Sequence, residues 1–307
     1  MAKRKHFGGT PVSEGVRLEV GKYTVFAVRK ADKDIAMRMR REPREFLRIM
    51  MRIPFLRGAA RLVRDIYRFF DGLAESAEFK PQRVVRGTTA EKAVARMLRV
   101  HPQSIVTLTS AILMLLIAFI CLFAAPLGAE ALLETHFSLN RAWINGIVCA
   151  VRVIGFVMAI VLTGQLRVFK RLLMYRCAIN MVTNCYECGG KLTPENAARY
   201  PRYARRSEPA FLISVMIISL ILFSLLRIDN ILLSIIIRLL IIFGVAAVLN
   251  EPFSALEVAE LNWATRILRA PIDLFQHMTT AEPHPQMLEL TVCAFKAALG
   301  ELEETAE

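Results

Sequence analysis

The first hundred residues contain no long apolar run, so the chain lacks the apolar segment of a signal peptide. Its six cysteines are too few and too unevenly spaced for a secreted disulfide scaffold, and we interpret them as reduced thiols. The sequence also has no nucleotide-binding glycine loop, no nucleophile elbow and no HExxH motif. These absences argue against a secreted protein and leave no common catalytic motif to explain the chain.

Long apolar segments follow the first hundred residues, and the whole chain is 55% hydrophobic with a mean hydropathy of +0.41. The first segment has 22 residues without charge and spans about 33 Å as a helix, enough to cross a bilayer. We expect Pro126 to end it, because proline lacks the backbone N–H that a helix needs. The sequence therefore predicts a mainly α-helical integral membrane protein with four transmembrane helices, at residues 104–125, 142–166, 210–226 and 231–249.

The positive charge of the connecting segments predicts the orientation. Residues 1–103 contain 24 Lys and Arg against 11 Asp and Glu, and residues 167–209 contain nine against three. Because translocation of Lys and Arg is disfavoured, we place both segments in the cytoplasm, and hence both chain ends at the inner face of the cell membrane. Residues 250–307 form an acidic tail, which we expect to dock on the basic N-terminal region. The predicted divisions are residues 1–103, 104–166, 167–209, 210–249 and 250–307.

The N-terminal region combines a β-hairpin with basic amphipathic helices. Residues 16–30 alternate apolar and polar side chains around a Gly-Lys turn, which predicts a hairpin. Residues 43–79 predict a helix that breaks at Pro54, with apolar residues on one face and arginines on the other. Such a helix favours binding to the anionic lipids of the cytoplasmic leaflet, or packing on the protein itself. Nucleic acid is not an expected partner, because no RNA-binding motif accompanies the arginines Arg57, Arg61, Arg64 and Arg68.

Two arginines lie inside the predicted spans, Arg152 and Arg238. A charge near the bilayer centre costs several kcal/mol unless it is paired or hydrated, and the predicted spans contain no Asp or Glu. Both arginines would lie at a comparable depth, where together they could bind an anion such as a lipid phosphate. Alternatively, each could reach backbone carbonyls, water or the outer headgroups.

Three cysteines and a glutamate in the second basic segment form the other candidate site. Cys185-Tyr186-Glu187-Cys188 has the C-x-x-C spacing of half a zinc ribbon, and Cys177 could supply a third ligand. A fourth ligand for a divalent metal such as zinc is missing from this segment, which contains no histidine. The alternative is a turn with free thiols. Glu187 is the candidate catalytic residue if a metal binds here.

Several short segments resemble the YqhQ-like family, bacterial membrane proteins that are described only as predicted metal-dependent enzymes. The resemblance extends over nearly the whole chain and includes an Ile-Pro-Phe-x-Arg-Gly segment at residues 53–58 and the Cys-Tyr-Glu segment. The residues that match the family are Glu14, Arg57, Gly58, Cys185, Tyr186, Glu187 and Arg206. The resemblance implies a metal-dependent membrane enzyme.

The departures from the family weaken that implication. Where the family has Glu and His just before Cys-Tyr-Glu, this chain has Ile179 and Asn180, and isoleucine cannot bind a metal or transfer a proton. We therefore rank first a non-catalytic membrane protein that binds lipid, a protein partner or a second copy of itself. A metal-dependent enzyme with its site at residues 177–191 ranks second. An anion transporter or channel subunit that uses Arg152 and Arg238 ranks third.

Overall fold

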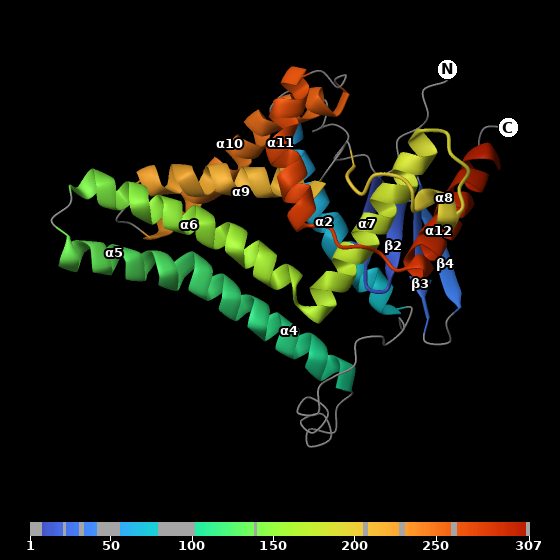
Figure 1. Cartoon of the computed structure of the whole chain (residues 1–307), viewed down its shortest axis with the longest axis horizontal. Helices are drawn as coiled ribbons and strands as arrows, with labels where there is room; N and C mark the ends of the chain where they lie inside the picture. Colours follow the sequence, from blue (N-terminus) through green and yellow to red (C-terminus); the bar gives the residue numbers. More distant parts are fainter. Residues whose placement is uncertain are drawn as a thin grey trace.

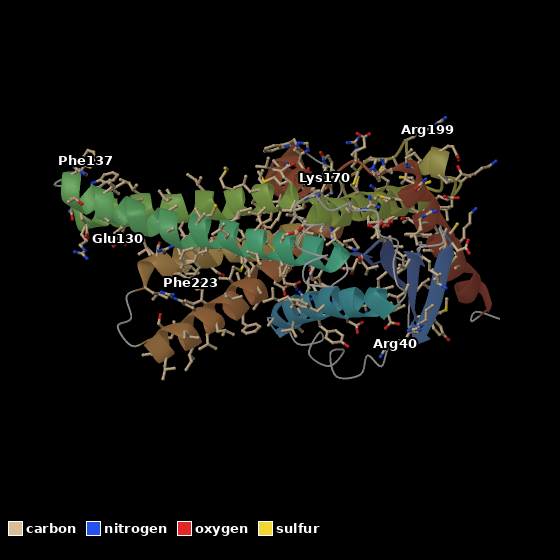
Figure 2. All side chains as sticks on the ribbon, turned by 90° about the horizontal axis from the view of Figure 1, so that it is seen from below. Arg40, Glu130, Phe137, Lys170, Arg199 and Phe223 are labelled. Carbon is tan, nitrogen blue, oxygen red and sulfur yellow. The ribbon has the colours of Figure 1, made fainter. Side chains whose placement is uncertain are left out.

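The computed structural model describes residues 8–20, 23–30, 34–41, 56–78, 102–137, 140–204, 208–226, 231–258 and 263–304. Long helices occupy one side of the molecule, and a small sheet with its covering helices occupies the other (Figure 1). Phe137 and Glu130 lie at the far end of the long helices, whereas Arg40 and Arg199 lie at the opposite end (Figure 2). We call these two ends the hairpin end and the sheet end.

Four long apolar segments are helical, as predicted, and each is long and apolar enough to cross a membrane. The first consists of α4 (Pro102–Phe119), the π-helical turn η1 (Ile120–Ala124) and α5 (Ala125–His136). The others are α6 (Arg141–Gly164), α9 (Glu208–Leu225) and α10 (Ile231–Val258). Because their number is even, β1 (Gly8–Val12) and α12 (Pro285–Glu304) can both lie at the sheet end (Figure 1).

The prediction that Pro126 ends the first span is wrong, because the helix continues to His136. Pro126 lies in the first turn of α5 and offers no N–H to the preceding turn. The wider turn η1 comes directly before it, and there the Ala125 N–H bonds to the Ile120 carbonyl, five residues back. As a consequence, Glu130 lies in the continuous helix and is half-buried, instead of lying in a loop.

The predicted hairpin is confirmed as β2 (Gly15–Val20) and β3 (Tyr23–Arg29), with the predicted turn outside the described residues. The hairpin belongs to a four-stranded antiparallel sheet in the order β1-β2-β3-β4, where β4 is Ile35–Arg41. β1 and β4 were not predicted. A tight turn joins β1 to β2, and Glu14 adopts a positive φ of 55° in it.

The two faces of the sheet have different chemistry. The apolar face, which includes Val16 and Leu18, packs on α7 (Arg167–Glu187) and α12. The predicted docking of the tail on the N-terminal region is therefore confirmed, although mainly apolar side chains form the contact. The opposite face carries Arg17 and Glu19 and is covered by α2 (Leu56–Glu78). Residues 43–55 of the predicted helix lie outside the described residues.

Two shorter helices complete the sheet end. α8 (Pro194–Ala197) packs on α7 and α12. α11 (Trp263–Met278) contacts α9, α10 and α6, and it runs across the long helices rather than along them (Figure 1). α2 links the two parts, because it packs on α10 at its start and on β1 farther along (Figure 1).

The start of α2 touches α10 at Gly58, where an added Cβ would overlap the Ala246 carbonyl and the Ala247 Cα. We predict that Gly58→Ala lowers stability by about 1–3 kcal/mol, because the two helices must move apart. The matched control is Gly244→Ala on α10, where an added Cβ meets no atom within 4 Å. Thermal unfolding in detergent would measure both variants, and equal unfolding midpoints would contradict the close crossing.

Candidate functional site

Three of the four arginines of α2, Arg61, Arg64 and Arg68, point into the molecule, whereas Arg57 is 42% exposed. Arg61 is almost fully buried, donates a hydrogen bond to Asn250 of α10 and lies over the Phe211 ring of α9, 4.6 Å from its centroid. Arg68 forms an ion pair with Glu19 of the sheet. Arg57 forms one with Glu251 of α10. The arginine face therefore joins the sheet to the long helices, and it does not face the surroundings as the lipid-surface prediction requires.

A buried carboxylate lies among these arginines. Asp65 is 2% exposed, and its Oδ1 accepts a hydrogen bond from Arg64 Nε at 3.2 Å. Its Oδ2 lies 3.8 Å from Arg61 Nε and has no hydrogen-bond partner among the described residues. Burial is the largest cause that raises the pKa of Asp65, to about 6, and the negative charge of Glu208 adds to it. The arginines act in the opposite direction.

The sheet contributes a second buried arginine to this region. Arg17 is fully buried in β2, donates a 2.8 Å hydrogen bond to the Arg68 carbonyl and lies 3.3 Å from Asp71 of α2. Arg38 of β4 pairs with Glu75, near the end of α2. We call this set the arginine–carboxylate layer; its members are Arg17, Glu19, Arg38, Arg61, Arg64, Asp65, Arg68, Asp71 and Glu75.

The outward face of α2 is apolar. Phe70 is 64% exposed, and Val63, Ile66 and Tyr67 are also exposed. The sequence correctly indicated an amphipathic helix, and its apolar face is the one turned away from the rest of the protein. The sequence signal that could have shown this is Asp65, a single acid in the middle of the arginine face.

A clamp attaches the β1–β2 turn to the start of α7. Both oxygens of the Glu14 carboxylate accept hydrogen bonds from Arg171, at 2.5 Å each, and Tyr175 donates to Glu14 at 3.4 Å. Glu14 and Tyr175 are buried, and burial raises the pKa of the Tyr175 hydroxyl. This arrangement gives the family-matching Glu14 a structural partner. Sequence analysis did not identify Arg171 or Tyr175.

The three cysteines of the predicted metal site do not converge. Cys177 and Cys185 are buried in α7, two turns apart, whereas Cys188 is exposed just after the helix. Burial raises the pKa of the Cys177 thiol to about 11 and also raises that of Cys185, which opposes the thiolate form that metals bind. Within the described ranges, no group of three or more His, Cys, Asp or Glu could hold a metal ion. The candidate Glu187 lies in the last turn of α7.

The residues that replace the family's acid and histidine have structural contacts. Ile179 packs against Gly9 of β1, which has no side chain to fill that space. The Asn180 amide donates to the Arg202 carbonyl at 2.9 Å, and Asn184 donates to the carbonyls of Pro201 and Tyr203 at 2.8 Å each. This polar side of α7 therefore binds the backbone that follows α8.

The same backbone segment is also fastened to α11. Gln276, which is buried, accepts from the Ala204 N–H at 2.9 Å and donates to the Ala204 carbonyl at 3.1 Å. Tyr203 and His277 form a 2.8 Å hydrogen bond. α7, residues 201–204 and the end of α11 thus form one hydrogen-bonded cluster. Arg206, which the resemblance singled out, lies outside the described residues.

The two intramembrane arginines occupy different places. Arg238 is exposed on α10, and its guanidinium lies 5.7 Å from the centroid of the Phe223 ring of α9. Arg152 is half-buried on α6, one turn before Gly155, which packs against the Cys121 carbonyl of η1. α6 packs mainly on the first span and on α9, and α10 also packs on α9. A common pocket for the two arginines stays a prediction.

The fold defines a class of protein: four helices able to span a membrane, carrying a four-stranded sheet unit at one end. The model of a family of proteins of unknown function, DUF1385, matches residues 53–301, and the chain belongs to this family. It is similar to the uncharacterized protein YqhQ of Bacillus subtilis (strain 168), with 25% identity over 296 residues that cover 95% of this chain and 92% of the relative. No solved structure matches.

The contribution of the Glu14 clamp to stability can be measured by removing the charge of Arg171. Arg171→Gln leaves a buried carboxylate without its counter-charge, and we expect a loss of stability of about 3 kcal/mol. Arg202→Gln is the control, because Arg202 and Glu282 form an exposed pair that contributes no more than about 1 kcal/mol. Thermal unfolding of the two variants would compare them, and a loss no larger for Arg171→Gln than for Arg202→Gln would refute the clamp.

The burial of the cysteines predicts how fast each thiol reacts with an alkylating reagent. In the folded protein, N-ethylmaleimide should modify Cys188 and leave Cys177 and Cys185 unmodified, because burial keeps these two protonated and covered. Mass spectrometry of peptides after timed labelling would measure each site. In a Cys188→Ser variant, α7 should stay unlabelled until denaturant is added. Labelling of Cys177 as fast as Cys188 would show that α7 is not packed as described.

Proposed function

We propose that this protein is a non-catalytic membrane protein that binds lipids of the cytoplasmic leaflet through helices at its sheet end. The observation that carries the proposal is the exposed apolar surface of α2 and α11, which lie where the long helices meet the sheet unit (Figure 1). On α2 it consists of Val63, Ile66, Tyr67 and Phe70, and on α11 of Trp263 and Leu274.

Lipid is the partner that fits this surface best. α11 runs across the long helices, as a helix in the plane of a membrane interface does, and Trp263 at its start is 79% exposed. Tryptophan and tyrosine favour the level of the lipid headgroups, because their rings are apolar with one polar group. The first turns of α2 lie against α10, so their exposed side chains continue the apolar surface of the long helices.

Two features support a non-catalytic role. The positions at which the family resemblance implies an acid and a histidine carry Ile179 and Asn180, and both are used in packing and backbone binding. The buried thiols have raised pKa values, so they are poor metal ligands. Both features make the alternative of a metal-dependent enzyme at residues 177–191 less favourable.

The orientation belongs to the same proposal. The described parts of residues 1–41 and 167–204 lie toward the sheet end (Figure 1), and the segments 1–103 and 167–209 contain most of the Lys and Arg of the chain, as segments that stay in the cytoplasm do. The opposite, hairpin end carries Arg141 with Glu130 and Glu134. We therefore place the sheet unit at the inner face of the cell membrane.

Anion binding in the membrane is a second candidate function. Arg152 is half-buried about 18 Å from the sheet end of α6, and no described residue forms an ion pair with it. An intramembrane cation of this kind marks a candidate ligand site. Arg152 and Arg238 lie on helices that both pack on α9, and a site shared by them stays a prediction, so this candidate ranks below lipid binding.

The two tryptophans allow a direct test, because Trp263 is the first residue of α11, where the long helices meet the sheet unit, and Trp143 is in the first turn of α6, at the hairpin end. In bilayers, Trp143→Phe leaves Trp263 as the sole tryptophan. We expect lipids that are brominated near the headgroup to quench its fluorescence more than lipids brominated near the methyl ends. We also expect water-soluble acrylamide to quench it weakly.

The control for this measurement is Trp263→Phe, which reports Trp143 alone. Strong acrylamide quenching of Trp263 together with no effect of brominated lipid would show that α11 is in water, and lipid binding by this surface would be rejected. Native mass spectrometry would add the affinity: Ile66→Ser with Phe70→Ser should reduce the phospholipid that stays bound after purification, whereas Thr280→Ser should not.

A further inference from the structure

Two carboxylates, Asp65 and Glu208, lie near the place where α2 meets the long helices. Asp65 of α2 is 2% exposed, and its Oδ2 lacks a hydrogen-bond partner in the described part of the chain. Glu208, in the first turn of α9, is 4.0 Å from Arg176 of α7. Arg61, whose Nε lies 3.8 Å from Asp65, also lies over the Phe211 ring, so Asp65 is near the start of α9, the helix that carries Glu208.

From this geometry we infer that Asp65 and Glu208 form a proton-binding site that couples acidity to the contact between the sheet unit and the long helices. When both carboxylates are ionised, they repel each other in surroundings that water screens poorly. One added proton on Asp65 removes that repulsion and gives its oxygen a hydrogen to donate. The site acts on α2, which is held between β1 and α10.

The charges around Asp65 come from every element that packs near it. Its own helix supplies three arginines at 3.2–4.0 Å. The groups that face the site are Arg61, Arg64 and Arg68 of α2, Arg17 and Glu19 of β2, Arg176 of α7, Glu208 of α9 and Asn250 of α10. Arg68 also pairs with Glu19, Arg17 with Asp71 and Arg176 with Glu208, so the positive charge near Asp65 is divided among several acids.

The raised pKa of Asp65 determines how the stability of the folded protein changes with pH. Burial, together with the charge of Glu208, raises the pKa of Asp65 from 3.8 to about 6. The folded protein therefore binds this proton more strongly than the unfolded chain does. As pH rises from about 4 to about 6, the folded state loses this advantage, so the contribution of Asp65 to stability is greatest in acid and is lost above pH 6.

Amide hydrogen exchange of α2 in lipid nanodiscs tests the site. Between about pH 8 and about pH 5, after correction for the intrinsic exchange rate, protection of α2 should rise about tenfold or more in the wild type. Asp65→Asn, an uncharged isostere, should give high protection at both pH values and no transition. Asp71→Asn, on the same helix but paired with Arg17, should keep the wild-type transition.

A second variant keeps the test decisive if Asp65→Asn does not fold. Glu208→Gln removes the negative charge that raises the pKa of Asp65, so the transition should move to lower pH. An unchanged transition in either folded variant, or flat protection in the wild type, would overturn the proton site. These results do not depend on lipid quenching of Trp263, so the proton site and lipid binding can fail separately.

Discussion

Arginine side chains cannot be buried without counter-charges, and this constraint determines how α2 is placed. Arg61 is buried and Arg68 is largely buried, so acids and amides of other elements must surround them. These partners are Glu19 on the sheet and Asn250 on α10. α2 thereby ties the sheet to the long helices, and its rotation leaves the apolar side chains Ile66 and Phe70 outward.

Close packing and ion pairs explain three of the family-matching residues. Gly58 permits α2 to approach the backbone of α10, and Arg57 beside it forms an ion pair with Glu251 one turn farther along α10. Glu14 is likewise explained by Arg171, to which it binds through both oxygens. These residues hold the elements together, so their presence in a family does not by itself indicate catalysis.

The sequence could predict the parts of the structure that depend on local pattern. Apolar runs gave the four spans, and period-two alternation gave β2 and β3. β1 was missed because its sequence, Gly-Gly-Thr-Pro-Val, contains residues that are rare in strands, and β4 because it alternates Met with Arg. The helix through Pro126 was missed because a proline normally ends a helix, and the π-helical turn that accommodates it has no sequence signal.

The candidate site was less predictable, because its geometry depends on partners that are distant in the sequence. From the sequence alone, the arginines of α2 resemble those of a lipid-binding helix. Their partners Glu19 and Asn250 are far away in the sequence, so only the structure shows these contacts. The spacing of the cysteines resembles half a metal site. In the structure, Cys177 and Cys185 are both buried in α7 and lie two helical turns apart. Arg171 and Tyr175 carry no motif at all, and only the β1–β2 turn shows their use.

The rotation of α2 is the central claim, because both the lipid surface and the arginine–carboxylate layer depend on it. Nitroxide labels on single cysteines at Ile66 and Phe70, read by electron paramagnetic resonance in bilayers, test it most directly. We expect these labels to be mobile and to collide with apolar oxygen more often than with a water-soluble nickel chelate. Labels that are immobile and shielded from both reagents would contradict the outward apolar face and, with it, the placement of the arginines.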